Sequence, residues 1–149
     1  MANPTPATVG VDHVGLSVRN LESTRRFFCD CLGWNVVGER PDYPAVFVSD
    51  GSLIVTLWQV ESPASAVAFD RRANVGLHHL ALAVADRPGL DAVHERVARW
   101  PDVVVEFAPE LSGKGPKIHF MVREPSGVRL EFAYDPRLEA VRKGRTRQA

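Results

Sequence analysis

The sequence has little of what marks several classes of protein. Its 149 residues carry no net charge, because 18 basic side chains balance 18 acidic ones. No apolar run approaches the ~18 residues that a membrane-spanning helix needs, and the first residues lack the basic and apolar segments of a secretory signal. A neutral protein offers no field to attract nucleic acid or an anionic membrane. We therefore expect neither partner, and a cytoplasmic location.

Cysteine is also scarce. Cys29 and Cys31 stand one residue apart, which is too close for a comfortable disulfide, and no further cysteines exist to build a zinc cage. We expect two structural thiols near the end of a helix, with a redox role as the alternative. The remaining composition, 45% hydrophobic and 24% charged, is that of an ordinary globular domain, and the length predicts one compact unit.

The chain repeats itself. Residues 11–18 read VDHVGLSV and residues 77–84 read LHHLALAV, so that aligning His13 with His79 aligns apolar, small, Leu, small and Val positions after them. Both runs alternate with a period of two, which is typical of a strand with one buried face. In each strand the histidine lies on the face opposite the apolar side chains.

Each of these strands is followed by a helix signal and three strand-like runs. The first helix is predicted from Leu21 to Leu32, after the N-cap Asn20, and the second from Pro88 to Trp100. The strand-like runs are 34–37, 45–49 and 53–60, and then 103–107, 117–123 and 128–134. The pattern predicts an α+β fold of two βαβββ modules, forming a cupped mixed β-sheet with the helices on its outer face.

The same pattern sets the expected boundaries. They are a flexible N-terminus (1–10), a first module (11–60), a linker (61–76), a second module (77–135) and a basic C-terminal tail (136–149). We expect the tail to be a loose, solvated segment.

Three residues stand out on the face turned away from the helices. His13 and His79 occupy equivalent positions of the repeat, and Glu131 lies in the middle of the last strand, on the face opposite Leu130 and Phe132. An unpaired carboxylate is poorly tolerated there, and a cation would relieve its cost. Two imidazoles and one carboxylate form a common ligand set for a divalent metal. A single histidine opening a strand is usually only structural, but this combination predicts a metal site.

The other histidines have less distinctive positions. His119 shares the inferred face of Glu131 and is a candidate acid or base, or a group that supports a ligand. His78 has the opposite parity to His79, and His94 falls on the second predicted helix, so we interpret both as structural or surface residues.

At this point the chain resembles a known family, the vicinal oxygen chelate superfamily, which includes glyoxalase I, extradiol dioxygenases and bleomycin-resistance proteins. The resemblance spans roughly residues 10 to 135 and is carried by DHVGLSV (12–18), FF and CLGW (27–28 and 31–34), GLHHLAL (76–82) and EPSGVRLEF (124–132). It implies that His13, His79 and Glu131 are the ligands of one divalent metal ion, Fe, Mn, Ni, Co or Zn, and that the chain forms a homodimer.

The chain departs from glyoxalase I at one position. That enzyme has a further Glu or Gln in the last strand of the first module, where this chain has Thr56, with Gln59 nearby at the opposite parity. The resemblance therefore implies a three-ligand site closer to that of the extradiol dioxygenases.

Three functions remain open. The first is a metal-dependent enzyme whose small-molecule substrate chelates the ion through two adjacent oxygens, in lyase, isomerase or oxygenase chemistry, with Glu131 and His119 as catalytic residues. The second is a metal-free protein that sequesters a small molecule or antibiotic, with Trp34, Phe47 and Trp58 as stacking surface. The third is a scaffold with neither activity.

Overall fold

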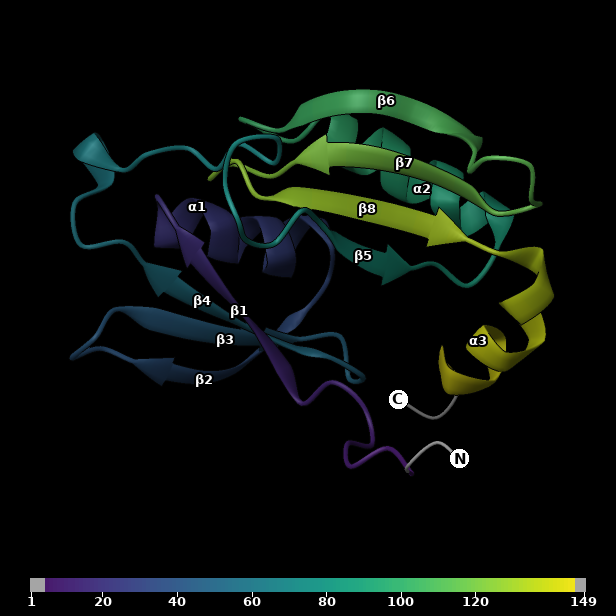
Figure 1. Cartoon of the computed structure of the whole chain (residues 1–149), viewed down its shortest axis with the longest axis horizontal. Coiled ribbons are helices and arrows are strands. Elements are labelled where there is room, and N and C mark those ends of the chain that lie inside the picture. Colours follow the sequence, from purple (N-terminus) through teal and green to yellow (C-terminus); the bar gives the residue numbers. More distant parts are fainter. Residues whose placement is uncertain (1–4, 147–149) are drawn as a thin grey trace.

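A computed structural model describes residues 5–146 and confirms the predicted α+β class and the duplication. The first module contains β1 (His13–Val18), α1 (Leu21–Arg26), β2 (Asn35–Arg40), β3 (Ala45–Ser49) and β4 (Ile54–Gln59). The second contains β5 (Leu80–Ala83), α2 (Arg87–Ala98), β6 (Val104–Leu111), β7 (Ile118–Arg123) and β8 (Arg129–Tyr134). Figure 1 shows the modules as two separate sheets with their helices behind them.

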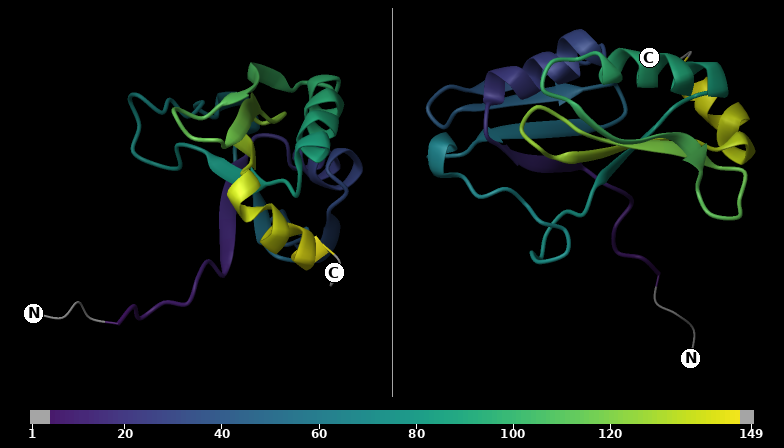
Figure 2. Two further views of the ribbon diagram at one scale, coloured as in Figure 1. Left: turned by 90° about the vertical axis from the view of Figure 1, so that its right-hand side faces the viewer. Right: turned by 90° about the horizontal axis from the view of Figure 1, so that it is seen from above.

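The two sheets have the same topology. Their strand orders are β1-β4-β3-β2 and β5-β8-β7-β6. In each sheet the first strand pairs in parallel with the last, while the remaining pairs are antiparallel. In Figure 2, α1 and α2 lie in one layer on the same side of both sheets, and the linker lies on the other side. Within residues 5–146, each sheet therefore keeps one face that no helix covers.

The core lies between the helices and the sheets, as the alternation predicts. In the second module, alternate residues of β7 and β8 point toward α2, and Phe120 and Phe132 stack with ring centroids 4.9 Å apart. Leu90 and Val97 of α2 are fully buried in the same cluster. Because side chains alternate across a strand, this packing turns His119 and Glu131 to the uncovered face.

The first helix has nearly the predicted bounds but changes its type along the way. The α-helix ends at Arg26 and continues as a π-helix over Phe27–Cys31, before Gly33 turns the chain with a φ of +79°. The wider turn brings Phe27, Phe28 and Cys31 into the core together. Both thiols are free, and burial raises the pKa of Cys31 to about 11, which agrees with a structural role.

The expectation of a loose C-terminal tail is wrong for the residues that the structure describes. After β8 the chain forms a short 3-10 helix, Pro136–Leu138, and then α3, Glu139–Thr146. The side chain of Asp135 caps the first of these, while the Tyr134 hydroxyl and the Lys143 ammonium both donate to Glu139. These local hydrogen bonds order a segment that composition alone indicates to be solvated. Residues 147–149 lie outside the described part.

At the N-terminal end the structure describes the chain from Thr5 onward. Residues 5–10 are exposed and contain no helix or strand, and residues 1–4 lie outside the described part. Across residues 5–146 we find no helix with the length and apolar character that a membrane crossing requires.

A buried carboxylate ties the two modules together. Glu124 lies on the turn between β7 and β8 and is 1% exposed. It accepts hydrogen bonds from the Thr24 hydroxyl of α1, at 2.7 Å, and from the backbone amides of Ser126 and Val128, each at 3.0 Å. Burial raises the pKa of Glu124 in spite of these donors. The contact fixes the helix of one module on the last hairpin of the other.

Replacing Thr24 by Val should lower the free energy of unfolding by about 1–3 kcal/mol, because Glu124 loses a donor where water cannot replace it. Thr24→Ser keeps the hydroxyl and serves as the matched control. Urea denaturation followed by circular dichroism measures both. Equal stabilities for the two variants would show that this contact does not hold the modules together.

Candidate functional site

Glu131 is at the centre of the uncovered face of the second sheet. It lies in the middle of β8, between Ala81 on β5 and Met121 on β7, and its side chain is only 6% exposed. Three cationic or imidazole groups surround the carboxylate. His79 Nε2 lies 3.0 Å from Oε2, while Lys117 Nζ, at 2.6 Å, and His119 Nδ1, at 3.1 Å, both contact Oε1. The sequence therefore correctly grouped His79, His119 and Glu131 on one surface.

The surroundings of Glu131 favour the charged form of its carboxylate. Burial by itself would raise the pKa of Glu131, but the hydrogen bonds from Lys117 and His119 bring it below its ordinary value. The sequence predicted a metal because burying an unpaired carboxylate is costly. The ammonium of Lys117 already offsets this cost. Lys117 has the same parity as His119 in the sequence, but nothing else in the sequence distinguishes it from a surface lysine.

His79 is held by its neighbour. It immediately precedes β5, with a side chain one-third exposed, and its Nδ1 lies 2.8 Å from Nδ1 of His78. One of these two nitrogens must donate and the other accept, so the pair fixes the orientation of the His79 ring. Arg129 in turn contacts His78 Nδ1 at 3.3 Å. His78 therefore supports the site, while His94 packs on Phe120 on the helix side of the sheet.

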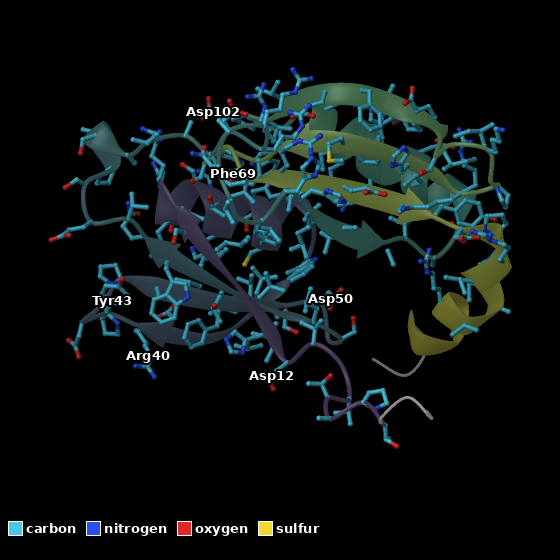
Figure 3. All side chains as sticks on the ribbon, in the orientation of Figure 1. Asp12, Arg40, Tyr43, Asp50, Phe69 and Asp102 are labelled. Carbon is cyan, nitrogen blue, oxygen red and sulfur yellow. The ribbon has the colours of Figure 1, made fainter. Side chains whose placement is uncertain are left out.

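His13 lies elsewhere. It opens β1 on the uncovered face of the first sheet, its side chain is 54% exposed, and its Nδ1 lies 2.7 Å from Oδ2 of Asp12. Figure 3 places Asp12 at the foot of β1, away from the second sheet. Within one chain the structure does not bring His13 to His79 and Glu131, and over the described residues no group of three or more His, Cys, Asp or Glu is assembled that could hold a metal.

The two candidates for a fourth ligand are both engaged. The Thr56 hydroxyl accepts a hydrogen bond from Trp58 Nε1 at 2.9 Å. The Gln59 side chain accepts from the backbone amide of Leu21, at 2.8 Å, and donates to the carbonyl of Arg19, at 2.6 Å. Gln59 therefore anchors the start of α1 and points away from the uncovered face.

The predicted stacking surface is only partly available. Trp34 is buried in the core against Phe28, with ring centroids 5.0 Å apart, so the expectation that it faces a ligand is wrong. Phe47 and Trp58 do lie together on the first sheet, with centroids 5.7 Å apart.

The donors of the second module fit a metal ion in their chemistry and spacing. In an octahedral shell, two neighbouring ligands that each lie about 2.1 Å from the ion are at right angles and about 3.0 Å apart. His79 Nε2 and Glu131 Oε2 have this separation. These two atoms could thus bind neighbouring positions of one ion, with the remaining positions supplied from outside this module.

A cavity of about 390 Å³ lies beside this face, where the two modules meet. Its walls come from β1, from the linker and from the start of β8, and they include Gly15, Ser17, Phe69, Leu77 and Arg129. Phe69, labelled in Figure 3, is on the linker. The walls are mainly apolar, and sequence reasoning did not foresee that the linker would form one of them.

An ion pair borders this cavity. The guanidinium of Arg129 binds the Glu106 carboxylate through Nε and Nη2, at 2.7 to 3.1 Å. These hydrogen bonds lower the pKa of Glu106 against the effect of its burial. Because Arg129 also reaches His78, the pair connects the cavity wall to the histidines beside Glu131.

Comparison with known proteins identifies the family. The model of the Glyoxalase/Bleomycin resistance protein/Dioxygenase superfamily matches residues 10–132. The chain belongs to this superfamily. The resemblance inferred from the duplicated motifs is thereby confirmed.

Individual members of the superfamily share at most about a third of their aligned residues with this chain in the comparisons that follow. A catechol-2,3-dioxygenase of Bacillus subtilis (strain 168) is 32% identical over 81 residues, which is 52% of this chain but 27% of that protein. The match thus spans about a quarter of the length of this relative.

Solved structures agree on the fold. A glyoxylase/bleomycin resistance protein/dioxygenase domain from Frankia sp. EAN1pec is 25% identical, with a TM-score of 0.70 over 85% of this chain and 98% of that one. A lactoylglutathione lyase from Agrobacterium tumefaciens is 19% identical, with a TM-score of 0.64 over 86% and 95% of the two chains.

Replacing Gln59 by Ala should destabilise the protein by about 1 kcal/mol, because the first turn of α1 loses its acceptor. It should leave the binding of divalent metal unchanged. Thermal unfolding and metal titration of the same preparation measure the two effects. Loss of metal binding in a folded Gln59→Ala protein would identify Gln59 as a ligand after all.

Proposed function

We propose that the chain is a metal-dependent enzyme of the glyoxalase/dioxygenase type, with His79 and Glu131 as two ligands of one divalent ion. The observation that carries the proposal is the 3.0 Å separation of His79 Nε2 and Glu131 Oε2, two good metal donors on one face of the second sheet. The ion is Fe, Mn, Ni, Co or Zn, all of which accept imidazole and carboxylate ligands.

The third ligand is His13 from a second copy of the chain. His13 is exposed on the equivalent face of the first module, yet it is not beside Glu131 in its own chain. Large apolar side chains are exposed around it and on the linker, namely Val9, Val11, Val67, Phe69, Val75 and Leu77. A surface that exposes such side chains is stabilised when another protein covers it. A twofold dimer would cover it and place His13 of one chain on the second module of the other.

When bound, the ion acts as a Lewis acid that stabilises a negatively charged oxygen of the substrate. The substrate is a small molecule with two adjacent oxygens, and the similarity to a catechol-2,3-dioxygenase supports a catechol among the candidates. The cavity of about 390 Å³ is of the size that takes such a molecule. Its walls are mainly apolar and include Arg129, which lies two residues before Glu131 on β8.

His119 is the proposed acid or base. Its Nδ1 lies 3.1 Å from Oε1 of Glu131, and its ring packs against Phe107 with centroids 5.1 Å apart. These two contacts hold the imidazole at the edge of the site, with its other nitrogen free of the carboxylate. From there it can give a proton to the substrate or take one from it, in lyase, isomerase or oxygenase chemistry.

The wild-type protein should bind about one divalent ion per chain, and His79→Ala and Glu131→Ala should lose it, because each removes a ligand. His94→Gln, on the helix side of the sheet, is the matched control and should keep the metal. Elemental mass spectrometry of the reconstituted proteins gives the stoichiometry. Full metal content in either site variant would refute the proposed ligands.

Mixing two variants that each lack one ligand of the proposed site tests whether the site is shared between chains. If His13 comes from the partner, each mixed dimer of His13→Ala and Glu131→Ala chains contains one intact site. Unfolding and refolding the two together should restore about a quarter of the wild-type metal content. No recovery, from a mixture shown to contain mixed dimers, would mean that the three residues do not meet across a dimer.

A second candidate function is supported by a separate observation. Lys117 already neutralises Glu131, so the face needs no metal in order to be stable. Together with the largely apolar cavity, this favours a metal-free protein that sequesters a small molecule or antibiotic. Saturable ligand binding that is unchanged by chelators and by His79→Ala would select this alternative.

A further inference from the structure

The Lys117 side chain is built into the site more firmly than a surface lysine. It immediately precedes β7, and its backbone carbonyl accepts a hydrogen bond from the amide of Ser112, at 2.8 Å, which closes the loop between β6 and β7. Its ammonium lies 2.6 Å from Oε1 of Glu131, and its side chain is one-third exposed. The contact is a short, charge-assisted hydrogen bond to a carboxylate that is 6% exposed.

The carboxylate divides its two oxygens between different partners. Oε1 receives Lys117 and His119, while Oε2 faces His79. An ion bound between His79 and Oε2 would therefore lie on the same carboxylate as an ammonium, and two cations on one carboxylate repel each other. The apolar strand neighbours of Glu131, Ala81 and Met121, offer no negative charge to offset this repulsion.

We propose that Lys117 is an internal cation that competes with the metal for Glu131. In the metal-free protein its ammonium stabilises the buried carboxylate, and metal binding must displace or weaken this contact. Lys117 therefore lowers the metal affinity of the site while making its metal-free form stable. Once released, the ammonium faces the uncovered side of the sheet, where it can contact an anionic oxygen of the substrate. This inference rests on the proposed ligand role of His79 and Glu131.

The test compares Lys117→Met with Lys114→Met, which removes the same charge from an exposed position on the same loop. Lys117→Arg keeps the charge, and Lys117→Gln provides a neutral variant that can still donate a hydrogen bond. Two quantities are measured for each protein. One is the dissociation constant for Zn²⁺, by competition with a chromophoric chelator, and the other is the melting temperature in EDTA and in excess Zn²⁺.

We expect Lys117→Met to bind Zn²⁺ at least about tenfold more tightly than wild type, since a hydrogen bond to a charged group stabilises by this factor or more. Lys117→Gln, which loses the charge but keeps a donor, should bind Zn²⁺ more tightly than wild type by a smaller factor. Both should melt at a lower temperature than wild type in EDTA and recover in Zn²⁺. Lys117→Arg and Lys114→Met should stay near wild type in both measurements.

The outcomes separate this inference from the proposed function. Unchanged or weaker Zn²⁺ binding in the two neutral variants, with normal binding in wild type, would overturn the competition and leave the metal site standing. Zn²⁺ binding by the neutral variants but not by wild type would support the competition in its strongest form. If no variant binds Zn²⁺, both the metal site and the competition are wrong.

Discussion

The site depends on a carboxylate that the fold places where water hardly reaches it. Glu131 is in the middle of a central strand, and its charge is maintained by groups that arrive from three directions: His79 from before β5, Lys117 from the loop before β7, and His119 from β7 itself. Removing one partner from such a charge usually costs more than the contact gains in isolation, because the charge is left buried. The register of β5, β8 and β7 therefore also brings together the groups that surround Glu131.

Because the two modules are duplicates, the first sheet contains a counterpart of the Glu131 site, but this counterpart has no carboxylate. In the first module the position equivalent to Glu131 is Thr56, whose hydroxyl is already bonded to Trp58. The two sheets share their topology but carry different side chains on their uncovered faces. The second sheet presents a carboxylate with histidines, and the first presents His13 and aromatic rings. Glu124 and Thr24 join the modules on the helix side, and the linker closes a cavity on the opposite side. Substrate recognition at the junction would draw on both kinds of surface.

The sequence predicted most of the fold because period-two alternation and the repeat reinforce each other. A strand whose alternate residues are apolar can bury only one of its faces against a helix. The alternation therefore predicts that His79, His119 and Glu131 lie together on the opposite face. The π-helical turn after Arg26 and the helix after β8 were missed, since each depends on specific packing or on local hydrogen bonds such as that of Tyr134 with Glu139. The role of Lys117 was missed for a similar reason, because a flexible side chain leaves its target undefined until the loop is closed. The position of His13 relative to the other two residues depends on how modules associate, which alternation within a strand does not encode.

The most direct test of the account is a crystal structure of the protein reconstituted with Zn²⁺, with anomalous diffraction measured on both sides of the zinc absorption edge. The account predicts one anomalous peak for each site, about 2.1 Å from both His79 Nε2 and Glu131 Oε2, with His13 of a second chain as a further ligand. A peak bound to other residues, or Glu131 still paired with Lys117 and no peak beside it in crystals saturated with Zn²⁺, would contradict it.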